Sequence, residues 1–502
     1  MTQQFNVTES ELKVIKSDLK RGKKYLAFLE EERKIRVTPT ASREAPGPRF
    51  AVCMGVTLAA LTVLIPVLTS AQGAFAVYND VESVLTALTE ILPPELKSSE
   101  TQRRAWPEWI AGHDRDIRER LLRGDEDTIV NWLLFGTSFT GQPRAFFDGP
   151  ETPESLRKRI SQRTKDLISA LHSTGRDERA AFARQLLRAK GFGFDSVEEQ
   201  VRLEQHLYAE VDRAVAERQL FMRREDAVPA GDVIGEVLAQ SNLFQDRGLS
   251  LDTSILASFA VEQALETMKS QGLLTPNAIR RVAVIGPGLD FADKNSGYDF
   301  YPVQTMQPFT SIDSLMRLGL AARPEELDLV TLDISPRVND HIRAMRDRAK
   351  VGTPYILRLP TDTGSPWMPG LVDYWKSVGD RIGSETAIPK PQDAVKGMEV
   401  RGIEVRSQVA GRITAMDFNV VTEKWTGPPF DLVIATNVLV YYDRLDQALA
   451  FSGIEAMLRP GGFFLTNNVV VELPASRLRS VGLMTVRHSA EKVDHLFWYR
   501  RL

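Results

Sequence analysis

A short apolar run, Val282–Ile285, leads directly into Gly286, Pro287 and Gly288. Glycine has no side chain, so it permits a tight turn and lets the backbone approach a ligand closely. A strand followed by such a turn is typical of sites that bind a nucleotide or nucleoside. Glycines are also frequent in ordinary turns, so this motif alone leaves a ligand loop and a simple turn equally open.

Two acidic residues stand at the ends of later apolar runs. The run LDLVTLD ends at Asp333 and is followed by Ile334, and RITAMD ends at Asp417 and is followed by Phe418. A carboxylate at a strand end can accept hydrogen bonds from both hydroxyls of a ribose. The second acid can accept from the amino group of adenine, with its apolar neighbour covering the ring. Each acid alone could be a turn residue or a cap, but their order along the chain favours an adenosine site.

A fourth segment, FDLVIATNVLVYYD, places Asn437 at the end of another apolar run, and LRPGGFFLTNN turns into a fifth. Taken together, these motifs resemble the class I S-adenosylmethionine-dependent methyltransferases. The segment FDLVIATNVLVYYD is similar to the corresponding part of chemotaxis-receptor glutamate methyltransferases. The resemblance begins near Arg280 and extends to the C-terminus.

The resemblance implies S-adenosylmethionine as cofactor and an unidentified oxygen or nitrogen as methyl acceptor. Asn437 would lie next to the methyl group, and Asp290 would either face the cofactor's ammonium group or cap the next helix. The cofactor-binding residues that it implies are Gly286, Pro287, Gly288, Asp290, Asp333, Ile334, Asp417, Phe418 and Asn437. The residues proposed to face the substrate are Tyr301, Tyr441 and Tyr442. No catalytic residue is implied; if the acceptor needs a base, the candidates are Asp443, His488 and His495.

The sequence also departs from the family pattern. Val284 stands where an acid is usual, and Asp290 where a third small residue is usual. Insertions at about 291–310 and 351–409 separate the motifs, and they are predicted to form either a lid or a surface elaboration. Two alternatives therefore stay open. One is a nicotinamide-dependent oxidoreductase, although Phe291 replaces the third glycine of its motif; the other is a non-catalytic methyltransferase-like binding protein.

The elements that must position these residues alternate between short β-branched runs and helix-like segments after residue 280. This alternation predicts an α/β fold, a Rossmann-like and mostly parallel sheet with helices on both faces. The final segment, from Arg479 to Leu502, predicts two antiparallel strands. Residues 78–279 carry apolar residues at helical spacing and predict an all-α region before the sheet. We expect the domain limits 1–50, 51–77, 78–279 and 280–502.

Composition narrows the function classes. The formal net charge is −3, without the basic excess of a nucleic-acid binder, so no nucleic acid is expected as partner. The one cysteine, Cys53, excludes an intrachain disulfide, and no metal site is expected. The apolar run within 51–77 leaves an export signal, a membrane anchor and a buried helix open. We expect a cytoplasmic catalytic domain, because the cofactor is made there, with membrane association through 51–77 as an added alternative.

Overall fold

The computed structural model describes residues 74–136, 139–142, 153–172, 178–225, 244, 248–250, 252–291, 302–362, 366–389, 399–470, 473–490 and 492–502. The predicted N-terminal segment 1–50 and most of the apolar segment 51–77 lie outside these ranges. Among the described residues, no helix is long and apolar enough to cross a membrane.

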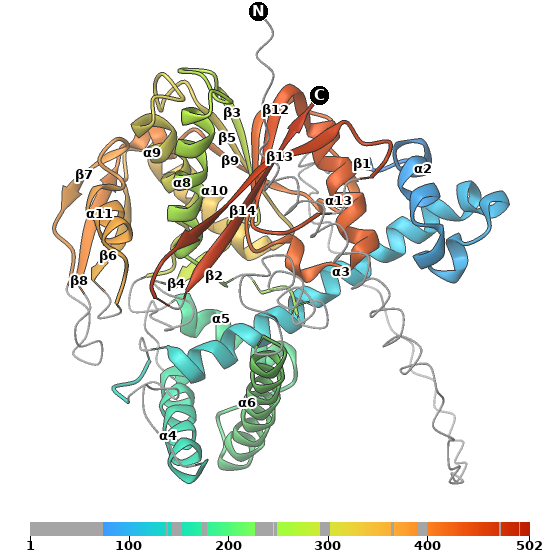
Figure 1. The fold of residues 1–502 in the computed structure, drawn as a ribbon. Coiled ribbons are helices and arrows are strands. Elements are labelled where there is room, and N and C mark those ends of the chain that lie inside the picture. Colours follow the sequence, from blue (N-terminus) through green and yellow to red (C-terminus); the bar gives the residue numbers. More distant parts are fainter. Residues whose placement is uncertain are drawn as a thin grey trace, which may run out of the picture. The chain divides into compact units, whose positions relative to one another are not determined.

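A seven-stranded sheet forms the centre of the structure (Figure 1). Its strands are β3 (Arg281–Ile285), β5 (Asp328–Asp333), β9 (Ile413–Asp417), β11 (Phe430–Ala435), β12 (Leu458–Thr466), β13 (Leu478–Arg487) and β14 (Val493–Arg501). They lie in the order β13-β14-β12-β11-β3-β5-β9. The strands from β12 to β9 are parallel neighbours, whereas β14 runs antiparallel to both β12 and β13. The predicted Rossmann-like sheet with a C-terminal antiparallel strand is confirmed.

The central strands are apolar on both faces because helices cover both sides of the sheet. Successive side chains of a strand point to opposite faces. In β3, Val282 and Val284 pack into one buried cluster, whereas Ala283 and Ile285 pack into another. This burial on both faces explains why β3 is a continuous apolar run rather than an alternating one.

Each face of the sheet has its own layer of helices (Figure 1). The first cluster contains α8 (Leu256–Ser270), α9 (Gln307–Arg317) and α10 (Pro336–Lys350). The second contains α13 (Arg444–Met457), α2 (Tyr78–Ala87) and the first half of α3 (Ser99–Phe135). Short 3-10 turns lie at Thr89–Ile91, Pro94–Leu96 and Leu439–Tyr441. Helices α2, α3 and α8 therefore pack on the sheet although they precede residue 280 in the chain.

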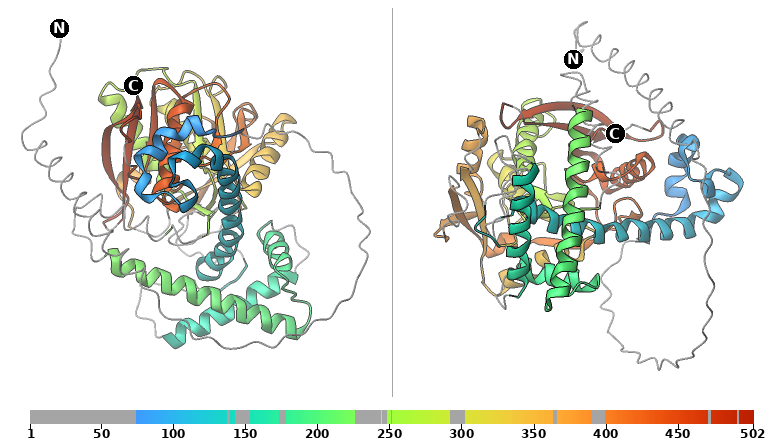
Figure 2. Two further views of the ribbon diagram at one scale, coloured as in Figure 1. Left: turned by 90° about the vertical axis from the view of Figure 1, so that its right-hand side faces the viewer. Right: turned by 90° about the horizontal axis from the view of Figure 1, so that it is seen from below.

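A separate buried cluster joins the end of α3 to α4 (Pro153–His172), α5 (Glu178–Ala189) and α6 (Val197–Glu225). Figures 1 and 2 show α4 and α6 on the side of α3 that faces away from the sheet. Arg163 of α4 is buried and donates hydrogen bonds to the carbonyl oxygens of Trp132, Leu133 and Gly136. The Trp132 carbonyl also accepts the last backbone hydrogen bond of the helix, from the Gly136 amide at 2.8 Å. The last carbonyls of a helix have no following turn to donate to them, and Arg163 supplies donors at this end of α3. The helical character predicted for this region is confirmed.

The predicted insertion at 351–409 contains a small antiparallel sheet of order β6-β8-β7. Its elements are β6 (Tyr355–Asp362), α11 (Pro369–Ser377), β7 (Gly383–Thr386), β8 (Glu399–Val405) and α12 (Ser407–Ala410). Buried side chains such as Leu357, Trp375 and Ile403 belong to the same cluster as α8 and α9. The insertion thus shares the core of the main domain. Two further short pairings join β1 (Ala74–Phe75) to β10 (Glu423–Lys424), and β2 (Asp252–Ser254) to β4 (Leu289–Phe291).

Candidate functional site

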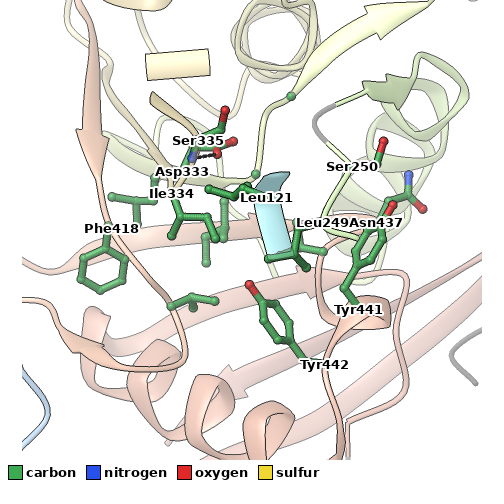
Figure 3. A pocket seen from close by; sticks show the side chains of 16 residues that line it. Leu121, Leu249, Ser250, Asp333, Ile334, Ser335, Phe418, Asn437, Tyr441 and Tyr442 are labelled. Carbon is green, nitrogen blue, oxygen red and sulfur yellow. Dashed lines mark hydrogen bonds between the residues drawn. The ribbon is translucent and has the colours of Figure 1, made fainter. Parts of the chain in front are cut away.

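A cavity lies at the carboxyl ends of β3, β5, β9 and β11 (Figure 3). In an open α/β sheet this edge is where ligands bind. Many of the residues that the sequence predicted line this cavity: Gly286, Gly288, Asp333, Ile334, Phe418, Asn437, Tyr441 and Tyr442. Residues predicted from four separate segments of the chain are therefore brought to one place.

The glycine turn after β3 has a backbone that only glycine adopts readily. Gly286 and Gly288 both have a φ of 62°, in the left-handed region. The Gly286 amide donates to the carbonyl oxygen of Leu332 at 2.8 Å, which ties the turn to β5. A β-carbon at Gly286 would stand 2.5 Å from Cγ2 of Val438, which also lines the cavity. Backbone conformation and close packing thus both require glycine at this position.

Asp333 ends β5 and lies at one end of the cavity (Figure 3). Its Oδ1 accepts a hydrogen bond from the Ser335 amide at 2.8 Å. Burial raises the pKa of the Asp333 carboxyl to about 7, and the neighbouring Asp417 adds to this, although backbone amides of Ser335 and Gly288 favour the ionised form. The ionised carboxylate is therefore poorly solvated and gains strongly from hydroxyl donors.

Asn437 follows β11 at the other end of the cavity (Figure 3). It has a φ of 59°, a left-handed conformation that asparagine tolerates better than most residues. Its backbone amide donates to Oδ1 of Asn467 at 2.8 Å, and Nδ2 of Asn467 donates to Oδ1 of Asn437 at 2.8 Å. This reciprocal pair fixes the end of β11 to the end of β12. Next to it, Nε2 of Gln307 donates to Oγ1 of Thr436 at 2.7 Å, so this end is polar but uncharged.

Other predicted residues lie elsewhere. Asp290 is buried and accepts a hydrogen bond from the Met306 amide at the start of α9, which is the capping alternative of the sequence prediction. Pro287 is buried in the glycine turn but does not line the cavity. Asp417 does not line it either, and forms an ion pair with Arg118 of α3. Tyr301 lies outside the described residues.

The candidate bases are also absent from the lining of the cavity. Asp443 caps α13 by accepting a hydrogen bond from the Asp446 amide at 2.9 Å. His488 pairs with Asp494 at 3.0 Å, and His495 is 2.9 Å from the Thr485 hydroxyl, both in the β13–β14 hairpin. These side chains have structural partners where they stand, and the described part of the insertion at 351–409 contributes nothing to the lining.

Three lining residues come from the helical region, which sequence reasoning did not connect with the site. They are Leu121 of α3 and the adjacent residues Leu249 and Ser250. Figure 3 shows Leu121 and Leu249 between the end that holds Asp333 and the end that holds Asn437. A leucine at helical spacing is usually a core residue, so the sequence carried no signal that these leucines face a ligand site.

The strand order and the positions of the motifs now decide the fold. Counted along the chain, the first five strands lie in the order 3-2-1-4-5, with the glycine turn after the first strand and Asp333 after the second. The last strand, β14, lies antiparallel between β12 and β13. The sheet is therefore Rossmann-like, as the sequence predicted.

Comparisons with known proteins add little detail to this fold. No family model matches the chain. The chemotaxis protein methyltransferase of Klebsiella aerogenes is 28% identical over 67 residues, which are 13% of this chain and only 23% of that protein. The match to the N-methyltransferase NodS from Bradyrhizobium japonicum spans 48% of this chain and 96% of the NodS chain, with 14% identity and a TM-score of 0.24. Magnesium protoporphyrin IX methyltransferase from Synechocystis, solved with bound SAM, covers 56% of this chain and 90% of its own, with 10% identity and a TM-score of 0.23. Scores this low say nothing about the activity of this chain.

The wall that Leu249 forms depends on a contact between two glycines. A β-carbon at Gly124 of α3 would stand 1.9 Å from the carbonyl oxygen of Leu249, and one at Gly248 would stand 2.2 Å from the Gly124 nitrogen. We expect Gly124→Ala to lower the free energy of unfolding by about 1–3 kcal/mol, because backbone must move to admit the methyl group. Urea denaturation measures this.

Gly112 on the same helix is the matched control. A β-carbon there would meet nothing closer than Arg115 Nη2 at 3.6 Å. Gly112→Ala is therefore expected to raise the free energy of unfolding by about 0.5–1 kcal/mol, since alanine is the better helix former. Equal stabilisation by both alanines would show that α3 does not press on the 248–250 segment.

Proposed function

We propose that the cavity binds S-adenosylmethionine and that the protein is an S-adenosylmethionine-dependent methyltransferase. The observation that carries this proposal is the arrangement of Asp333, the glycine turn and Asn437 around one cavity at the ends of four strands. A half-buried carboxylate with a raised pKa that faces a cavity beside two left-handed glycines is typical of a functional site.

The donor set fits an adenosine with an amino-acid side arm. The Asp333 carboxylate would hold the ribose hydroxyls, which supply the hydrogen bonds that burial denies it. Ile334, Phe418 and Val420 form an apolar wall at that end of the cavity for the purine ring. The glycine turn would hold the middle of the molecule with its backbone, and Asn437 would lie beside the reacting group.

The cofactor supplies a methyl group made electrophilic by a sulfonium. Transfer of this methyl group needs close, in-line approach of an acceptor and no covalent intermediate on the enzyme, so the contribution of the protein is mainly positioning. The Tyr442 hydroxyl points into the cavity (Figure 3). Burial raises the pKa of Tyr442 above its ordinary value, so this hydroxyl acts as a hydrogen-bond donor at neutral pH rather than as a base. We propose an oxygen or nitrogen acceptor on a small molecule or a protein side chain.

Calorimetric titration of the full chain tests the proposal. S-adenosylmethionine and S-adenosylhomocysteine are expected to bind with one-to-one stoichiometry, and NAD⁺ is expected not to bind. Binding of NAD⁺ alone would favour the oxidoreductase alternative, and no binding of either sulfur compound to folded protein would overturn the proposal. Methyl transfer from radiolabelled S-adenosylmethionine to acceptors in a cell extract then separates an enzyme from a binding protein that holds the cofactor without turnover.

A further inference from the structure

Arg118 connects α3 to the strand end next to the cavity. It lies three residues before Leu121, which is part of the cavity wall. Its Nε donates to Asp114 Oδ2 at 2.9 Å, its Nη1 to Asp417 Oδ1 at 2.8 Å and its Nη2 to Glu423 Oε1 at 3.1 Å. All three nitrogens of the guanidinium are thus engaged by carboxylates. Such charge-assisted hydrogen bonds are among the stronger polar contacts in proteins.

Asp114 extends this connection on α3. Its Oδ1 accepts hydrogen bonds from Nδ2 of Asn419 and from the Thr422 hydroxyl, each at 2.7 Å. The three side chains are buried, so these bonds are shielded from water. Asp114 and Arg118, on one turn of α3, therefore hold the segment 417–423 through hydrogen bonds along its length.

This segment forms the wall at the purine end of the cavity. Asp417 pairs in register with Asp333 across β5 and β9, and the Phe418 amide donates to the Asp333 carbonyl oxygen at 3.2 Å. Phe418 and Val420 line the cavity, whereas Asp417 does not. Apolar side chains of the segment face the cavity, and its terminal carboxylate is engaged by α3.

We propose that Arg118 is a positioning residue for the purine end of the site, and that its hydrogen bond to Oδ1 holds the Asp417 carboxylate outside the cavity, away from the adenine amino group. This inference rests on the proposed function. It assigns purine binding to apolar contact with Phe418 and Val420. It makes Arg118 and Asp114 the groups that hold that wall in place.

The consequence concerns specificity for the purine base, which should differ from that of a site where a carboxylate binds the adenine amino group. A buried acceptor left without its donor typically costs a factor of about 10 to 100 in affinity. If no side-chain carboxylate accepts a hydrogen bond from the adenine amino group, then replacing that group by oxygen leaves no acceptor at Asp417 without its donor, and this loss of affinity does not occur. S-adenosylhomocysteine and its 6-oxo analogue, S-inosylhomocysteine, should then keep the same affinity ratio whether or not residue 417 is an acid.

The decisive experiment is calorimetric titration of both compounds into the full-length wild-type protein and into Asp417→Asn. The asparagine has nearly the same shape and can still accept a bond from Arg118. The ratio of the two dissociation constants is expected to stay within about threefold between the two proteins. A wild-type preference for the amino compound that falls at least tenfold in Asp417→Asn would overturn the inference. No binding of S-adenosylhomocysteine to the wild type would instead overturn the proposed function, so the two failures are distinguishable.

Arg118→Gln tests the positioning role directly, with Arg115→Gln as control because Arg115 is exposed on the same helix. Arg118→Gln is expected to weaken the binding of both compounds at least tenfold, by equal factors. Arg118→Lys is expected to weaken binding less, because lysine keeps the positive charge but lacks the forked guanidinium that contacts several carboxylates at once. Circular dichroism verifies folding of each variant. Unchanged affinity in folded Arg118→Gln would contradict the role. If this variant does not fold, Arg118→Lys and the ratio in Asp417→Asn decide the question.

Discussion

Replacing Asp333 with asparagine is expected to weaken S-adenosylmethionine binding by roughly 100-fold or more while making the free protein harder to unfold. The loss of affinity follows because two ribose hydroxyls lose a charged acceptor. The gain in stability follows because the pKa of Asp333 is raised to about 7 in the folded protein, chiefly by burial. Titration calorimetry and urea denaturation measure the two effects separately.

The pH dependence of the stability effect has a definite sign. An acid whose pKa is higher in the folded state than in the unfolded state binds its proton more tightly when folded, so ionisation favours unfolding. For Asp333 this penalty develops as the pH rises from about 4 to about 7 and is complete above that. The excess unfolding free energy of Asp333→Asn over the wild type should therefore be larger at pH 8.5 than at pH 5.5, by about 1–2 kcal/mol. Wild-type affinity for the cofactor should rise between roughly pH 6 and 8, as the carboxylate ionises.

Asp340 provides the matched control, because it lies on α10 and its side chain is 74% exposed in a surface pair with Arg343. Asp340→Asn should change neither the cofactor affinity nor the pH dependence of unfolding. If Asp333→Asn bound the cofactor as the wild type does, the carboxylate would have no part in ribose recognition. If it also lost stability at pH 8.5, burial would not be the main influence on that group.

The positions of the strand ends were predictable from the sequence because the relevant signals are local. A fully buried parallel strand is a short apolar run, and the residue after it must lie at the ligand edge of the sheet. Gly286, Asp333, Phe418 and Asn437 were found in this way, and the structure brings them to one cavity. The final antiparallel pair was predictable for the same reason.

The side chains that close the cavity from outside the sheet were not predictable. Leu121 and Leu249 are separated from Gly286 by long stretches of chain, and in sequence they look like any other apolar residue of a helical region. The partner of Asp417 was hidden for the same reason. A sequence shows that an acid ends a strand, but not that an arginine about 300 positions earlier will donate to it. Packing between distant parts of the chain determines such contacts, and the local periodicity of the sequence does not predict them.

Gly286→Ala is expected to abolish measurable S-adenosylmethionine binding and to destabilise the fold by about 2–4 kcal/mol. Two separate costs add in this variant. The left-handed backbone, with a φ of 62°, disfavours any residue that has a β-carbon, and the new carbon would stand 2.5 Å from Val438 Cγ2. Either the turn or the Asn437 loop must move, and both line the cavity. Calorimetry and urea denaturation report on the two consequences.

A second substitution separates these costs. In Gly286→Ala/Val438→Ala the clashing methyl group is gone, and the new β-carbon would face the Val438 Cβ at 3.7 Å, an ordinary contact. The double variant should recover the steric part of the lost stability and part of the binding, leaving a deficit of about 1–2 kcal/mol from the backbone conformation. Val438→Ala alone should bind the cofactor within a few fold of the wild type, since its methyl groups fill space and donate no hydrogen bond.

If Gly286→Ala bound the cofactor normally, the glycine turn would not hold the ligand. If the double variant were no better than Gly286→Ala, the close approach to Val438 would not be what makes glycine necessary, and the backbone conformation alone would account for it.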